Sequence, residues 1–341
     1  MSSNEILVRN AEYDKLRAVG IVLVVLGHTL GISRGFELYI YSFHMPLFFF
    51  LPGLMLKPER LALSLTAVIR HYAYRLLIPY FFFSLITYLP WVFITRYRGA
   101  DAALNIPAWK PVIGTLYGVG INGWLQHNAM LWFFPSLFLV HILFHQLHNR
   151  LRSYSLLVLV FSCATLGYLM SIYMPFRLPW GAEAALVSIP FYTAGFALSE
   201  RGTTKLKPGF YMATGVFILA LLQLVCVTTN GRTDMNFLVF ENPLLFYLGA
   251  FAGIGALVGG VLFLPSYLIF SRIADASILV FSLHRPIFSV ITGVGLVLSV
   301  DMHALKATVS GSIVYTSLAI AVSIAVWPFA RRYLPMLVGG R

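Results

Sequence analysis

Long apolar runs recur along the whole chain, and they constrain its fold more than any other feature. Each run has roughly 18 to 25 residues, which is enough for a helix to cross about 30 Å of hydrocarbon. Strands with open edges cannot satisfy their backbone hydrogen bonds in lipid, so the spans must be helical. We therefore predict an all-α, multi-pass membrane protein with about ten transmembrane helices. The predicted spans cover residues 16–32, 38–56, 76–95, 128–147, 154–174, 184–199, 209–228, 243–264, 274–297 and 308–329.

The composition leaves no room for a sizeable soluble domain, because 59% of the residues are hydrophobic and only 11% are charged. We therefore treat residues 1–341 as a single transmembrane domain. Cys163 and Cys226 lie in apolar runs and lack the spacing of metal or redox sites, so we expect them to pack as small core residues.

The basic residues lie in the short connections between spans. A net charge of +12 would suit a nucleic-acid partner, but the charges form no single patch, so we expect no such partner. If the N-terminus is cytoplasmic, sixteen Lys and Arg residues fall on the inner side and seven on the outer side. This distribution predicts that both termini lie in the cytoplasm.

The first span, within YDKLRAVGIVLVVLGHTLG, carries Arg17 at its start and His28 near its end. A separation of eleven residues puts both side chains on one helix face, roughly 16 Å apart along the axis. Arg17 is then at the cytoplasmic mouth and His28 in the outer half of the membrane. An ionisable residue at this depth is a functional candidate. The alternatives are that Arg17 sets topology and that His28 makes a helix-packing hydrogen bond.

The second span, YSFHMPLFFFLPGLML, places His44 at a depth similar to that of His28. Two imidazoles side by side in a dry site suit general-base chemistry near neutral pH. Alternatively, His44 is the hydrogen-bond partner of backbone groups freed by Pro46 and Pro52.

The stretch RHYAYRLLIPY begins the third span and brackets the cytoplasmic mouth with Arg70 and Arg75. Arginine forks bind phosphate groups through paired hydrogen bonds, so Arg17, Arg70 and Arg75 could together hold a nucleotide-type donor. Ordinary anchoring at the inner surface would explain each of these arginines separately.

Other polar residues are weaker candidates. His284 and Arg285 lie near the middle of the ninth span, where a helix-to-helix hydrogen bond is the alternative role. Glu183 lies at an outer edge, where it could grip sugar hydroxyls or meet water. Trp124 belongs to the longest outer connection, about 96–127, which we expect to fold over the membrane surface.

Three histidines share one face near the cytoplasmic end of the fourth span, at positions 141, 145 and 148. Their spacing permits metal binding, but no carboxylate or cysteine accompanies them. We therefore interpret them as interfacial residues and expect no metal site.

Five motifs in sequence order resemble those of the acyltransferase 3 family of integral membrane acyltransferases. They are YDKLRAVGIVLVVLGHT, FHMPLFFFLPGLML, RLLIPYFFF, LWFFPSLFLVH and VFSLHRPIF, and they span residues 13–288. The resemblance is closest to the branch of fucose 4-O-acetylase-like and surface-polysaccharide O-acetyltransferases.

The resemblance implies transfer of an acyl group, usually acetyl, from cytoplasmic acetyl-CoA to a hydroxyl of a cell-surface glycan. Arg17 and His28 match the family's arginine and catalytic histidine, and Arg75 matches the second arginine of its Arg-x-x-Arg motif. Tyr72 stands where the first arginine is expected, and Arg70 is the nearest substitute. We take His28 and His44 as catalytic candidates. Further candidates for acceptor contact or structural roles are Asp14, Trp124, Trp132, Glu183, His284 and Arg285.

The resemblance also implies no permanently bound cofactor and a location in the bacterial inner membrane. Acetyl-CoA, membrane lipid and a glycan or undecaprenyl-linked saccharide are the expected partners, and a homo-oligomer is left open. The chain ends shortly after the tenth span, so we expect no appended SGNH esterase-like domain. The competing interpretation is a secondary transporter of a small sugar or anion, since intramembrane His and Arg also mark transport paths. We find no two related halves that would favour it.

Overall fold

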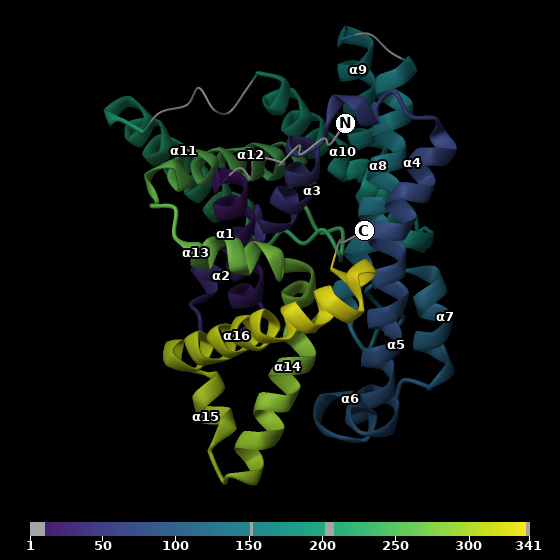
Figure 1. The fold of residues 1–341 in the computed structure, drawn as a ribbon, viewed down its shortest axis with the longest axis vertical. Helices are drawn as coiled ribbons and strands as arrows, with labels where there is room; N and C mark the ends of the chain where they lie inside the picture. The colour runs from purple at the N-terminus through teal and green to yellow at the C-terminus, as the bar shows by residue number, and fades with distance from the viewer. Residues whose placement is uncertain (1–10, 151–152, 202–207, 339–341) are drawn as a thin grey trace, which may run out of the picture.

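The computed structural model describes residues 11–150, 153–201 and 208–338 (Figure 1). These residues form an all-α structure, which confirms the predicted fold class. Its helices are α1 (Ala11–Gly27), α2 (Arg34–Tyr41), α3 (His44–Leu54), α4 (Leu65–Tyr72), α5 (Ile78–Phe93), α6 (Gly99–Leu104), α7 (Trp109–Tyr117), α8 (Phe133–Arg150), α9 (Ser153–Tyr173), α10 (Ala182–Arg201), α11 (Phe210–Asn230), α12 (Pro243–Gly260), α13 (Leu268–Asp275), α14 (Ser277–Val297), α15 (Met302–Lys306) and α16 (Val309–Tyr333).

Within the described residues, eight helical stretches are long and apolar enough to cross a membrane. They correspond to the last eight predicted spans and support a multi-pass membrane protein. Their bounds are Leu65–Tyr97, Ala129–Asn149, Tyr154–Tyr173, Pro179–Glu200, Phe210–Asn230, Pro243–Phe263, Ser277–Val297 and Val309–Tyr333.

The first two predicted spans are shorter helices. α1 has 17 residues, and the second span is divided into α2 and α3. The break falls at Phe43, whose backbone leaves the helical region at φ −140° and ψ −15°. Pro46 then lies in the first turn of α3, where its missing N–H costs no intrahelical hydrogen bond. The count of ten spans and the cytoplasmic position of the termini stay predictions, and the terminal residues themselves lie outside the described ones.

The third span begins earlier than predicted, because Ser64 caps α4 and accepts a hydrogen bond from the backbone of Ala67 at 3.3 Å. A π-helical segment, Ala73–Leu77, joins α4 to α5. Pro79 has no N–H to donate to the carbonyl of Arg75, which favours a wider turn at this point. Arg75 therefore projects from an irregular turn and not from a regular helix.

The helices divide into a central and a peripheral set. In α8 and α10, 72% of the most apolar stretch is buried, against 22% in α9 and 17% in α11. In Figure 1, α4 and α5 follow one another along the long axis and α8 lies beside α4, whereas α11, α12 and α16 lie across the view. The exposed apolar faces of α9 and α11 are those expected to contact lipid.

The backbones of α3 and α10 touch through glycines. A Cβ atom on Gly53 would overlap the carbonyl oxygen of Tyr192, and one on Gly195 would overlap that of Phe50. Small residues at such crossings allow close packing in lipid, where no hydrophobic force draws helices together. This contact holds α3, and with it His44, against the central helices.

Several connections meet beyond the last turn of α1. The backbone N–H of Gly31 donates to Ser312 Oγ at 3.0 Å, so the turn after α1 contacts the start of α16. The connection 231–242 reaches the same region. The side chain of Asn230, just before it, forms hydrogen bonds with the backbone near its end. The Asn230 side chain donates to the carbonyl of Phe240 at 3.0 Å and accepts from the backbone N–H of Asn242 at 2.8 Å.

Candidate active site

A cavity of about 320 Å³ lies at the end of α1, where these connections meet. Its wall carries both predicted catalytic histidines together with Trp132 and Arg285. The residues that line it are Val24, Gly27, His28, Thr29, Leu30, Ile32, Glu37, Tyr41, His44, Met45, Met130, Trp132, Arg232, Asp234, Met235, Asn236, Phe237, Phe281 and Arg285.

Three histidines from three helices meet beside this cavity. The ring centre of His28 is 6.4 Å from that of His44 and 5.1 Å from that of His284. The prediction that His28 and His44 lie side by side is therefore confirmed by the structure. His284, treated as a weaker candidate, is the nearer neighbour of His28, because α14 packs against α1.

Each of the three imidazoles is oriented by the backbone carbonyl of the residue four positions before it. Nδ1 of His28 lies 2.6 Å from the carbonyl oxygen of Val24, and Nδ1 of His44 lies 2.9 Å from that of Ile40. In His284 the corresponding distance to Val280 is 3.0 Å. A carbonyl oxygen only accepts, so Nδ1 carries the proton and donates it. Nε2 of each neutral ring is then left with a free lone pair, as a general base requires.

His284 differs from the other two because it is completely buried and does not line the cavity. Its Nε2 atom has no hydrogen-bond partner among the described residues. Buried polar atoms are seldom left in this state, and such an atom beside a reactive group points to a functional role. The only signal in the sequence was the motif VFSLHRPIF, which does not reveal that His284 contacts His28.

The connection 231–242 supplies cavity residues that the sequence did not single out. Arg232 pairs with Asp234 at 3.0 Å, and its guanidinium lies 5.7 Å from the centre of the Tyr41 ring. The Tyr41 ring is 4.9 Å from that of His44. No motif or apolar period marks this connection, and it reaches the site only through the fold.

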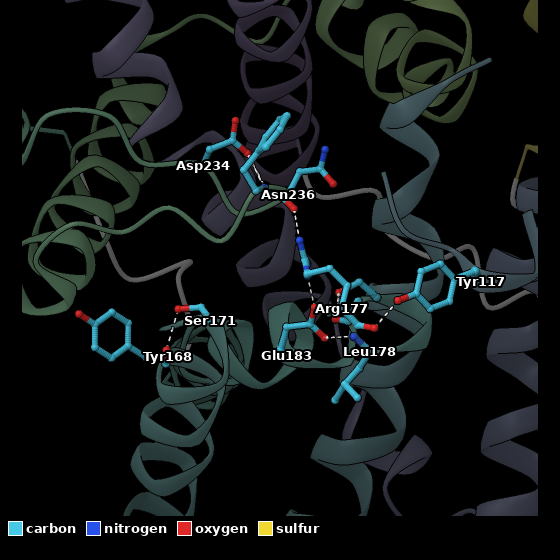
Figure 2. A network of polar contacts seen from close by, with 11 residues as sticks. Tyr117, Tyr168, Ser171, Arg177, Leu178, Glu183, Asp234 and Asn236 are labelled. Carbon is cyan, nitrogen blue, oxygen red and sulfur yellow. Dashed lines mark hydrogen bonds and ion pairs between the residues drawn. The ribbon is translucent and has the colours of Figure 1, made fainter. Parts of the chain in front are cut away.

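Arg177 holds the same connection from outside the cavity (Figure 2). Its guanidinium is ion-paired with Glu183 and donates to the carbonyl of Asn236 at 2.7 Å. The Asn236 side chain in turn donates to the carbonyl of Gly120 at 3.3 Å. The expectation that Glu183 meets sugar hydroxyls or water is therefore wrong, because its carboxylate is buried in this ion pair. α9 packs closely on α10 here, since a Cβ atom on Gly167 would lie 2.8 Å from the carbonyl oxygen of Glu183.

The predicted tryptophans have different positions. Trp132 is buried and lines the cavity, where it packs 6.4 Å from the Phe49 ring. Trp124 lies outside the cavity wall, with its ring 5.1 Å from the Lys110 ammonium and 5.2 Å from the Tyr117 ring. Trp132 therefore stays a candidate for acceptor contact, whereas Trp124 packs against residues of its own connection, 96–127.

The predicted donor arginines lie away from this cavity. Arg17 is near the start of α1, with Asp14 in the preceding turn, and its guanidinium contacts Met55 Sδ at 3.1 Å. Arg70 is exposed on α4, and Arg75 is exposed on the π-helical segment, within electrostatic range of His141. These contacts belong to different helix pairs, so a shared donor pocket for the three arginines stays a prediction.

Tyr72, which replaces an expected arginine, is buried in a stack of rings. Its ring lies 3.5 Å from that of His141 at an angle of 14°, and Nδ1 of His141 is 2.9 Å from the Tyr192 hydroxyl. The interfacial interpretation is wrong for His141 and His145, because α4 covers this part of α8 and buries both. In the described residues, no group of three potential ligands could hold a metal ion.

A family model described as an acyltransferase domain matches residues 10–328. The match includes all of α1 and most of α16, and therefore every residue of the cavity wall. No curated protein matches the chain significantly.

Proposed function

Because the chain belongs to the acyltransferase 3 family, we propose that it is an O-acetyltransferase of the bacterial inner membrane. It transfers an acetyl group from acetyl-CoA to a hydroxyl of a surface glycan or of a lipid-linked saccharide. The observation that carries the proposal is the orientation of His28, whose Nδ1 donates to its own helix while the ring lines the cavity. Family membership favours an enzyme over the transporter considered from the sequence.

His28 acts as the general base. Its Nε2 accepts the proton of the acceptor hydroxyl while the hydroxyl oxygen attacks the carbonyl carbon of the thioester. The carbon–sulfur bond then breaks, and the departing CoA sulfur takes the proton back from Nε2. His44 lies across the cavity and orients the hydroxyl, since its own Nε2 is also free to accept a hydrogen bond.

Donor and acceptor enter from opposite ends of α1. Arg17, Arg75 and Arg70 bind the phosphates of the donor, because a guanidinium matches phosphate geometry. The pantetheine arm extends along α1 and brings the thioester to His28, roughly 16 Å from Arg17 along the helix axis. Trp132 and the connection 231–242 form the wall that the acceptor contacts.

Two measurements test the proposal. Purified protein should release CoA from acetyl-CoA when a glycan acceptor is present, which a transporter would not do. Mass spectrometry of surface glycans should show that cells lacking the protein lose the mass increment of an acetyl group. Unchanged glycans together with no CoA release would contradict the proposal.

The same preparation distinguishes direct transfer from an acyl-enzyme. An acetyl group recovered on a His28 peptide, together with a burst of CoA release before acceptor is added, would identify His28 as a nucleophile. If neither is seen while steady transfer continues, the acetyl group passes directly to the hydroxyl.

A further inference from the structure

Arg285 lines the cavity and forms no ion pair with an acid in the described part of the chain. Both acidic residues of the wall already have their own partners. Glu37 pairs with Arg34 at 2.7 Å, and Asp234 pairs with Arg232 at 3.0 Å. Neither of these acids is ion-paired with Arg285 itself.

A second cation lies close to Arg285. Lys306, on α15, has its ammonium 5.9 Å from the centre of the Tyr315 ring. Burial, together with the positive charge of Arg285, lowers the pKa of Lys306. Two like charges near each other repel, and an anion bound at Arg285 would relieve that repulsion.

The positive-inside rule does not explain the position of Arg285. Basic residues that set orientation belong to the inner connections, whereas Arg285 lies within α14, directly after His284. Its side chain is exposed and lines the cavity, so the guanidinium is accessible to a ligand there. Guanidinium groups bind carboxylates and phosphates through two parallel hydrogen bonds.

We propose that the acceptor is an anionic saccharide and that Arg285 binds its carboxylate or phosphate group. This inference rests on the proposed acetyl transfer and names the substrate class for the same cavity. Binding of the anion at Arg285 places a neighbouring hydroxyl beside His28. A carboxylate would belong to an acidic sugar, and a phosphate to the linkage of a lipid-linked saccharide.

Three probes with one sugar ring separate these cases. They are methyl glucoside, which is neutral, methyl glucuronide, which carries a carboxylate, and glucose 1-phosphate. The full-length protein is placed in nanodiscs of neutral lipid, and two quantities are measured for each probe: thermal stabilisation of the protein and release of CoA from acetyl-CoA. We expect at least one anionic probe to half-saturate at a concentration about tenfold or more below that of methyl glucoside. The stronger of the two anionic probes identifies the source of the charge.

Three variants test whether the preference for anionic probes depends on Arg285. Arg285→Gln should abolish the preference for the anionic probe, and Arg285→Lys should keep part of it because the charge remains. The matched control is Arg98→Gln, since Arg98 is an exposed arginine outside the cavity wall. It should keep the full preference. If Arg285→Gln does not fold, a weakened preference in Arg285→Lys still assigns the site.

Equal half-saturation by neutral and anionic probes would overturn the inference, as would a preference that persists in Arg285→Gln. CoA release with methyl glucoside as the best probe would keep the proposed function and remove the anion site. Stabilisation by an anionic probe, lost in Arg285→Gln and accompanied by no CoA release with any probe, would keep the anion site and count against acetyl transfer.

Discussion

The most direct prediction concerns His28→Ala, which removes the proposed base. A positioned general base accelerates a reaction by about 10² to 10⁴, which corresponds to roughly 3 to 5 kcal/mol of activation free energy. The structural cost of the substitution is smaller. The half-buried ring makes one hydrogen bond to its own helix, and such a bond contributes about 1 kcal/mol to the free energy of unfolding. Activity should therefore fall much further than stability.

The assay measures CoA release from acetyl-CoA by chromatography, alongside the thermal unfolding of each preparation. His28→Gln is the informative second variant, because an amide can accept a hydrogen bond but cannot take a proton at neutral pH. It should be as inactive as the alanine variant. His303→Ala is the control, since His303 is exposed on α15 and lies outside the cavity wall.

Two results would refute the role given to His28. One is a folded His28→Ala protein that keeps more than about a tenth of the activity, which is too much for the loss of a general base. The other is recovery of activity in His28→Gln, which would show that the ring only positions the acceptor.

Three further substitutions test other parts of the structure. Arg75→Gln should raise the KM for acetyl-CoA about tenfold and change kcat much less, because it weakens donor binding and leaves the histidines in place. Gly53→Ala should lower the free energy of unfolding by about 1 to 3 kcal/mol, since its Cβ overlaps the Tyr192 carbonyl and backbone atoms cannot move aside cheaply. Glu183→Gln leaves the largely covered Arg177 without its counter-charge and should cost about 3 kcal/mol of stability. It should also speed amide hydrogen exchange in 231–242.

Matched control substitutions separate these specific effects from a general loss of stability. Gly35→Ala should not lower the unfolding temperature, because a Cβ atom there meets no neighbouring atom within 4 Å and alanine favours the helix more than glycine does. Glu59→Gln changes an exposed carboxylate and should leave exchange in 231–242 as it is. Donor KM in Arg98→Gln should match that of the unaltered protein. A Gly53→Ala protein as stable as its control would contradict the close contact between α3 and α10.

The helical fold follows from the sequence, because length and apolarity decide whether a segment can cross a bilayer. Eight of the predicted spans have a counterpart of sufficient length. The break before His44 is harder to foresee, since α2 and α3 read as one apolar run. Hydropathy measures only transfer into lipid, and it carries no information on where a backbone leaves the helix.

The candidate site was predictable in part. His28 and His44 are close in sequence, at the end of α1 and the start of α3 with only α2 between them, and their rings meet. His284 is far from His28 along the chain. The 3.6-residue period of a helix predicts which face is buried, but not which other helix packs against that face. Glu183 and His141 show the same limit, because both have the sequence context of membrane edges and are buried by neighbouring segments.

Composition and local pattern were thus sufficient for the membrane class, for the helices and for the histidine at the end of α1, because these depend on residues near one another in the chain. The packing of α14 on α1 and the position of 231–242 in the cavity wall depend on contacts between distant segments. The lack of an ion pair at Arg285 is of the same kind, because the fold pairs both acids of the cavity wall with other arginines.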